Sequence, residues 1–127
     1  MFDYTVTSQK SFQEAIDSLK EALISIKFGV LWELDVPGKL QEKGVQYKRN
    51  FRILEVCNPQ KAKEALEADI RVGYFLPCKI VVYVKDDITQ IGTIRPTTMI
   101  QMFNNTALHS FAHEVEQELI KAIDMAK

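Results

Sequence analysis

The sequence predicts an α+β protein, a two-layer sandwich in which helices pack on one sheet. Two segments, Phe12 to Ile26 and Thr106 to Ala126, carry apolar residues at steps of three and four, which is the pattern of a helix with one buried face. Five other segments alternate apolar and polar residues or are rich in β-branched side chains, which is typical of strands. A chain of 127 residues is long enough to close one core, so we expect a single domain over residues 1–127.

The predicted order along the chain is β-α-β-β-α-β-β-α. The expected strands are Phe2–Val6, Val30–Val36, Asn50–Cys57, Cys78–Val84 and Ile88–Ile94. The first helix begins with an S-x-x-E capping box, Ser11 and Glu14, and we expect Gly29 to end it. Asn58 precedes Pro59 in the arrangement typical of a helix N-terminus, which predicts a second helix over Pro59–Ala68.

Shorter segments connect these elements. Pro37-Gly38 interrupts the second strand, and Lys39–Lys43 is expected to form one helical turn. Val72–Leu76 is expected to be extended, and Asp86-Asp87 to form the turn of a hairpin. After Pro96, a short helix is expected to run as far as Phe103.

Composition and charge exclude several classes of protein. A net charge of −1 does not supply the basic surface that nucleic-acid phosphates require, and it gives no reason to expect an anionic membrane surface as a partner. The first residues contain no basic region followed by an apolar run, and the longest apolar runs fall far short of the roughly 20 residues that span a bilayer. We therefore expect a cytoplasmic protein with free thiols. Phosphate-binding glycine loops, G-x-S-x-G and C-x-x-C motifs are absent from the sequence.

Both cysteines lie beside turn-forming residues, Cys57 before Asn58-Pro59 and Cys78 after Leu76-Pro77. Antiparallel pairing of the two strands would bring both thiols to one sheet edge, whereas a parallel crossover would separate them by roughly 20 Å. Two thiols at one edge could bind a soft transition metal such as zinc, form a reversible disulfide or react with an electrophile. The plainer interpretation is two buried and inert cysteines.

The candidate ligand-binding residues are Arg52, Cys57, Asn58, Cys78 and Lys79. The leading hypothesis is a binding or sensing module that uses the Cys57/Cys78 edge for a metal ion, a small ligand or a redox response. One alternative is an enzyme with Cys57 as nucleophile, its pKa lowered by the helix N-terminus and by Lys79 or Arg52. The other is a structural or protein-interaction domain.

Two further groups of polar residues could form sites. His109, His113 and Glu116 share one side of the last helix and could bind a metal, although an exposed helix flank is the simpler interpretation. Six charged residues fall near predicted strands, and could line a polar cleft with Trp32 and Tyr83 as walls: Glu33, Asp35, Arg49, Arg52, Glu55 and Lys79. A two-fold homodimer is expected from the general frequency of such assemblies.

Several short motifs are distributed along the chain: Lys43-Gly44-Val45, Arg52-Ile53-Leu54, Cys57-Asn58-Pro59, Ala62, Ala65-Leu66, Leu76-Pro77-Cys78 and Val81-Val82-Tyr83. Together they resemble the domain of unknown function 302 family. The resemblance extends over nearly the whole chain. It implies a fold like the TATA-box-binding-protein-like class, a curved and mainly antiparallel sheet with two long helices on one face. It favours antiparallel pairing of the two cysteine strands and implies no activity.

The chain departs from the usual pattern of that family at two positions. Lys79 follows Cys78 where an asparagine is common, and Arg95 precedes Pro96 where an acidic residue is common. If these side chains belong to a shared site, the resemblance implies that its electrostatics differ in this chain.

Overall fold

The structure, a computed structural model, describes all residues from Met1 to Lys127. It confirms the α+β class, with a five-stranded antiparallel sheet and five α-helices. The elements are β1 (Asp3–Ser8), α1 (Phe12–Ser25), β2 (Gly29–Asp35), α2 (Val36–Glu42), β3 (Phe51–Cys57), α3 (Pro59–Ala68), the 3₁₀ helix η1 (Ile70–Tyr74), β4 (Cys78–Lys85), β5 (Ile88–Ile94), α4 (Pro96–Ile100) and α5 (Thr106–Ala126).

The sheet has the strand order β1-β5-β4-β3-β2, and every neighbouring pair is antiparallel. The chain therefore starts at one edge, crosses to the other edge through α1, and returns through β3, β4 and β5. A register shift between Val30 and Trp32 places Leu31 in a bulge of β2. After this bulge, the side chain of Trp32 lies on the same face as Glu55, its partner on β3.

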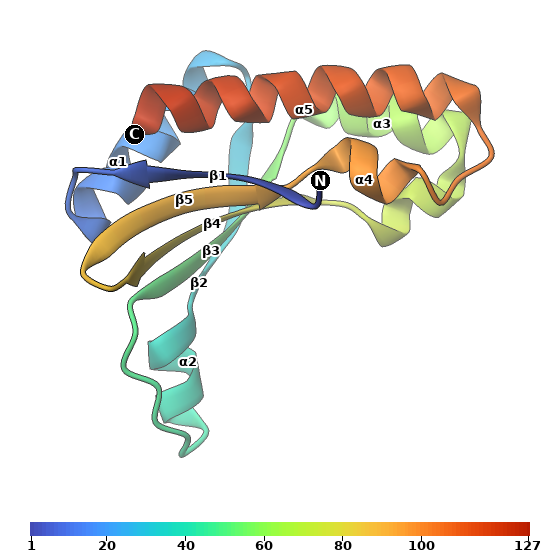
Figure 1. Cartoon of the computed structure of the whole chain (residues 1–127). Coiled ribbons are helices and arrows are strands. Elements are labelled where there is room, and N and C mark those ends of the chain that lie inside the picture. Colours follow the sequence, from blue (N-terminus) through green and yellow to red (C-terminus); the bar gives the residue numbers. More distant parts are fainter.

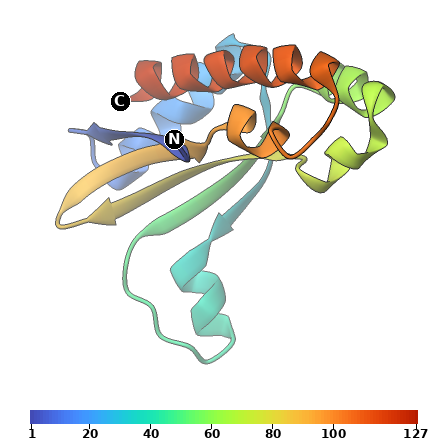
Figure 2. The ribbon, with the colours of Figure 1, turned by 45° about the vertical axis from the view of Figure 1, so that its right-hand side comes forward.

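Helices α1 and α5 lie on one side of the curved sheet, and α2 with the segment 43–50 projects from the opposite side (Figures 1 and 2). The main core lies between the sheet and these two helices. Its fully buried members include Leu19 and Leu23 on α1, Leu54 on β3, Ile80 on β4 and Leu119 on α5. The 3.6-residue period of the two helices and the two-residue period of the strands bring these side chains to a common layer.

The predicted helix N-termini are confirmed. Ser11 and Glu14 form a capping box, since Ser11 Oγ accepts from the Glu14 N–H at 3.3 Å and the Glu14 carboxylate accepts from the Ser11 N–H at 3.2 Å. Asn58 Oδ1 accepts from the Lys61 N–H at 3.2 Å and begins α3. Asp86 and Asp87 both have positive φ, as a tight hairpin turn requires.

The predicted end of the first helix is wrong. Helix α1 ends at Ser25, and Lys27, with φ of 66°, occupies the left-handed position that the prediction gave to Gly29. The Phe28 N–H bonds to the Leu23 carbonyl at 2.9 Å, which closes a Schellman-type C-cap. Gly29 instead begins β2, two residues after the left-handed position that favours glycine.

Two connecting segments also differ from the prediction. The second strand ends before Pro37-Gly38 as expected, but the helix that follows is longer than one turn and already begins at Val36. Pro37 and Gly38 lie in the first turn of this helix, α2, which Asp35 caps by accepting from the Gly38 N–H at 3.3 Å. Val72–Leu76 is not extended, because Ile70–Tyr74 forms η1. Asp69 caps η1 by accepting from the Arg71 N–H at 3.0 Å. No helix combines the length and the apolar character needed to cross a bilayer.

Candidate functional site

The two cysteines lie at the same end of two neighbouring strands, which is the sheet edge that antiparallel pairing predicted. Strands β3 and β4 are neighbours, and Val56 is the residue paired with Cys78. Cys57 follows Val56 at the end of β3, and Cys78 is the first residue of β4. The parallel alternative is thereby excluded.

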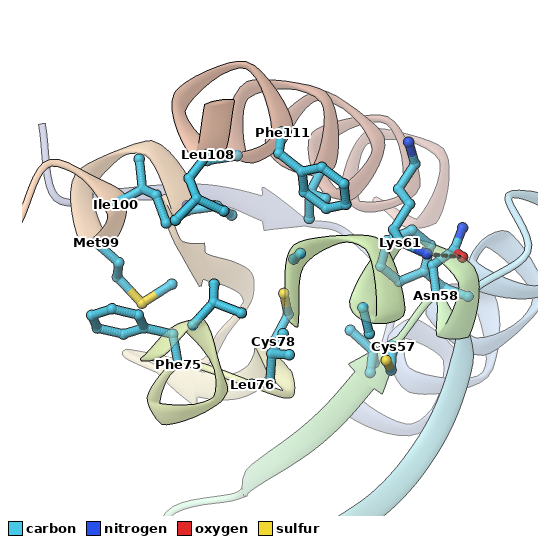
Figure 3. A pocket seen from close by; sticks show the side chains of 18 residues that line it. Cys57, Asn58, Lys61, Phe75, Leu76, Cys78, Met99, Ile100, Leu108 and Phe111 are labelled. Carbon is cyan, nitrogen blue, oxygen red and sulfur yellow. Dashed lines mark hydrogen bonds between the residues drawn. The ribbon is translucent and has the colours of Figure 1, made fainter. Parts of the chain in front are cut away.

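The same register separates the two side chains. Because Cys78 is opposite Val56, and successive residues of a strand point to opposite faces, Cys57 and Cys78 start from opposite faces of the sheet. In Figure 3 the Cys78 sulfur points into the space between the helices, whereas the Cys57 sulfur lies at the border of that space, beside the end of β3. A disulfide needs Cβ atoms that point toward each other, and this pair does not have that geometry. Both thiols are free.

Neither thiol is activated by its surroundings. Burial raises the pKa of Cys57, so the prediction that the N-terminus of α3 lowers this pKa is wrong. Burial, together with the charge of a neighbouring Cys57 thiolate, raises the pKa of Cys78 to about 11. At neutral pH both groups are therefore thiols, which are poor nucleophiles and poor metal ligands.

The basic residues proposed as partners of Cys57 are engaged elsewhere. Lys79 Nζ lies 2.7 Å from Glu55 Oε2, and Arg52 forms an ion pair with Glu33 near the other end of β3. Arg52 is five residues from Cys57, or about 17 Å along a strand. The charged residues predicted to line one cleft are thus divided between the two faces of the sheet.

An apolar pocket lies next to Cys78, between the end of the sheet and the helices α3, η1, α4 and α5 (Figure 3). Its volume is about 70 Å³, and 15 of its 18 lining residues are hydrophobic. Phe75, Leu76 and Phe111 are only partly buried, and they pack around a small second core that includes Leu108 and Ile100. The pocket is thus an opening within this second core.

The pocket has two polar side chains in its wall, and both are bonded to the protein. The Asn58 carboxamide caps α3. Lys61 Nζ lies 3.2 Å from Glu114 Oε2 and 5.7 Å from the centre of the Phe111 ring. Since no charge is left without a partner, the pocket is suited to an uncharged and apolar group.

Helix α4 forms one wall of the pocket through Pro96, Met99 and Ile100. Its N-cap residue, Arg95, makes no side-chain capping bond, and the cap is supplied by α5. Glu116 Oε1 accepts from the Thr97 N–H and hydroxyl, while Glu116 Oε2 pairs with Arg95 at 3.1 Å. Glu116 is therefore a buried structural group that holds α4 against α5.

The structure does not gather the metal ligands that the sequence suggested. His109 and His113 are exposed, and Glu116, on the same helix, is buried and bonded to Arg95 and Thr97. No group of three or more His, Cys, Asp and Glu side chains comes close enough to hold a metal ion. Cys57 and Cys78 therefore do not form a metal site either, because no third His, Cys, Asp or Glu side chain completes such a group.

A second cavity, of about 150 Å³, shares the side chains of Phe75, Cys78, Pro96 and Met99 with the first. It lies toward Lys79 and is the more polar of the two. Met99 lines both cavities, and its unbranched side chain is rotationally free. The two cavities thus form neighbouring compartments on either side of Cys78.

Three of the candidate ligand-binding residues, Cys57, Asn58 and Cys78, line this pocket, but the sequence did not predict the cavity or its helical walls. The sequence pattern predicts an extended segment that contains Phe75 and Leu76 and a short helix that contains Met99, and it indicates no binding role for these residues. One signal was available: residues 108, 111 and 112 of α5 are apolar although they lie beyond the part of the helix that packs on α1 and the sheet. An apolar stripe longer than the sheet it covers indicates a second packing partner.

The model of the family described as "Domain of unknown function DUF302" matches residues 4–126. The chain belongs to this family. A search of curated proteins finds no match for this DUF302 protein.

One solved structure is very similar to this DUF302 protein. It is the crystal structure of an uncharacterized conserved DUF302 protein from Bacillus stearothermophilus, which is 44% identical in sequence. The TM-score is 0.96, and the alignment covers 100% of this chain and 99% of that chain. The resemblance inferred from the cysteine motifs is confirmed.

Proposed function

We propose that this protein binds a small apolar molecule, or the apolar end of a larger one, in the pocket between α3, α4 and α5. The lining supports this proposal, since 15 of 18 residues are hydrophobic and aromatic rings stand at two sides. Ligand pockets are commonly apolar with few polar groups. A volume of about 70 Å³ admits a short alkyl chain, and displacement of Met99 would admit a larger group.

The thiols have a different role in this proposal from the one expected of a metal or redox site. Cys78 supplies a polarisable, apolar wall, and its raised pKa keeps it uncharged. A cysteine-dependent enzyme would need a thiolate, which both pKa shifts oppose. Free thiols suit a reducing compartment, so we propose a cytoplasmic location as well.

The proposal is tested by NMR of the protein labelled with ¹³C at its four Met methyl groups. Benzene, indole, hexanol and hexanoate are titrated separately. We expect a saturable shift of the Met99 signal with the neutral probes, and no shift of Met102 and Met125, which are exposed outside the pocket. The Met99 signal is identified as the one that is missing from the spectrum of the Met99→Leu variant.

A matched pair of variants separates ligand binding from a packing defect. Ala62→Leu adds bulk at the pocket wall, and Ala68→Leu adds the same bulk at an exposed position of α3. We expect Ala62→Leu to abolish the Met99 shift and Ala68→Leu to retain it. A Met99 signal that no probe shifts, combined with increased stability of Ala62→Leu, would show that the pocket is only an imperfectly packed core of a structural or interaction domain.

We also propose that the fold belongs to the TATA-box-binding-protein-like class. The curved antiparallel sheet with α1 and α5 on one side supports this assignment. An experimental structure, superposed on members of that class, tests it through the order and direction of the strands.

A further inference from the structure

Neither long helix packs on the sheet face opposite α1 and α5, and the centre of this face is apolar and partly exposed. Strand pairing defines the row that crosses its middle, in which Leu34, Ile53, Val81 and Gly92 lie side by side from β2 to β5. Their neighbours in sequence on β3 and β4, such as Leu54 and Val82, point to the opposite face and are fully buried. Both faces of the central strands are therefore apolar, whereas a sheet with one solvated face normally shows polar residues there.

Aromatic residues flank this row on the same face. Phe51 and Tyr83 are paired in the register, and their rings stack with centres 5.3 Å apart and planes 11° apart. Trp32, on the other side of the row, is half exposed. We call these six side chains the open-face patch: Trp32, Leu34, Phe51, Ile53, Val81 and Tyr83. A contiguous patch of this composition is typical of a protein–protein interface.

The two charged side chains next to Trp32 form a neutral pair. Glu55 and Lys79, next to Trp32 in the register, neutralise each other at 2.7 Å. Two copies related by a two-fold axis would thus bring the apolar rows together with this charge pair already neutralised.

The size of the face fits a dimer interface. Five strands at a spacing of about 4.8 Å, with about six paired residues each at about 3.4 Å, give a flat area of roughly 500 Å². Because side chains protrude from the sheet, the accessible surface area of this face exceeds its flat area and approaches the roughly 800 Å² per partner of a stable interface. The segment 36–50 projects from this same side (Figures 1 and 2) and carries exposed Val45 and Tyr47, which would lie beside a docked copy.

We propose that the open-face patch is the interface of a homodimer in which two sheets pack face to face. The pocket lies on the helix side, so this proposal is independent of the proposed ligand. Trp32 is the single tryptophan of the chain and belongs to the patch, which gives a direct spectroscopic probe.

The test is sedimentation velocity over about 1–200 μM, together with Trp32 emission on dilution. We expect the parent to have twice the chain mass of 14.6 kDa, and its emission to shift to longer wavelength as it dissociates. Val81→Glu and Tyr83→Lys should each give a monomer. Ile24→Glu, at an exposed apolar position of α1 away from the patch, should remain a dimer.

Thermal unfolding followed by circular dichroism shows that each variant is folded, and two separate patch variants keep the test valid if one fails to fold. A parent that is monomeric up to 200 μM overturns the proposal. So does a dimer that persists unchanged in both patch variants, because its interface would then lie elsewhere.

Discussion

Glu116 on α5 caps α4: its Oε1 accepts hydrogen bonds from the backbone N–H of Thr97 at 3.0 Å and from the Thr97 hydroxyl at 2.6 Å. Its other oxygen pairs with Arg95, whose guanidinium also donates to the Asp3 carbonyl and lies 5.5 Å from the centre of the Tyr4 ring. This one buried carboxylate thus connects α5, α4 and, through Arg95, the edge strand β1. It also fixes the wall of the proposed pocket.

Replacement of Glu116 by Gln is expected to lower the free energy of unfolding by about 1–3 kcal/mol, because a buried charged hydrogen-bond acceptor is lost while Arg95 keeps its charge. Urea denaturation measures the change. The control is Glu67→Gln, an exposed position of α3 that should change stability by less than about 0.5 kcal/mol. Equal effects of the two substitutions would contradict the capping role.

The same carboxylate makes stability depend on pH. Burial by itself raises the pKa of Glu116, but the hydrogen bonds from Thr97 and the charge and hydrogen bond of Arg95 outweigh burial and hold the pKa below its ordinary value of 4.5. A group whose pKa is lower in the folded state stabilises the fold above the unfolded pKa, and this contribution is lost as pH falls through the folded pKa. The stability difference between the parent and Glu116→Gln should therefore be constant from pH 7 to about 5.5 and shrink below pH 4.5. If the stability difference stays constant down to pH 3, ionisation of the Glu116 carboxylate is not the source of that difference.

Thiol reactivity should be low at neutral pH. Because burial raises the pKa of both cysteines, and that of Cys78 to about 11, iodoacetamide should modify both more slowly than an exposed thiol at pH 7.5. Cys57, which starts on the open face, should react first. Peptide mass spectrometry after timed alkylation measures each site, and the unfolded protein is the control. Rapid modification of Cys57 at pH 7 would instead revive the enzyme hypothesis.

Lys27 adopts a backbone conformation that favours glycine. Its φ of 66° ends α1, and its side chain is exposed. Lys27→Gly should raise the free energy of unfolding by about 0.5–1 kcal/mol, since the left-handed strain of a side chain is removed. Gly29→Ala is the comparison. A Cβ at position 29 would meet only the Cys57 carbonyl, at 4.0 Å, so alanine there should stabilise the fold by about 0.4–1 kcal/mol through the lower backbone entropy of the unfolded chain. Destabilisation by Lys27→Gly would contradict the assigned C-cap.

Much of the secondary structure could be predicted because its signals are local. The α3 and α5 ranges match the predicted Pro59–Ala68 and Thr106–Ala126, and the caps at Ser11 and Asn58 are as expected. Each depends on side chains within one or two turns of the backbone group they satisfy. The end of α1 shows the limit of that reasoning. There, the hydrogen bond between Phe28 and Leu23 held Lys27 in the conformation expected of Gly29.

The candidate site was predicted only in part. The cysteine motifs placed both thiols at one sheet edge, but strand alternation, set by the pairing of Val56 with Cys78, directed them to opposite faces. The histidines of α5 remained exposed, as the simpler interpretation expected, whereas Glu116 turned out to be buried. Its partner Thr97 belongs to a different helix, and no local pattern connects the two.

The sequence by itself determined the α+β class, the family, most strands and helices, and the edge at which the cysteines meet. These features follow from periodicity and from contacts between near neighbours in the chain. Only the tertiary structure decided which face each thiol occupies, that Glu116 caps α4, and that α3, η1, α4 and α5 leave an apolar opening beside Cys78. Those features depend on strand register and on the packing of distant helices, where a shift of one residue moves a side chain to the other face.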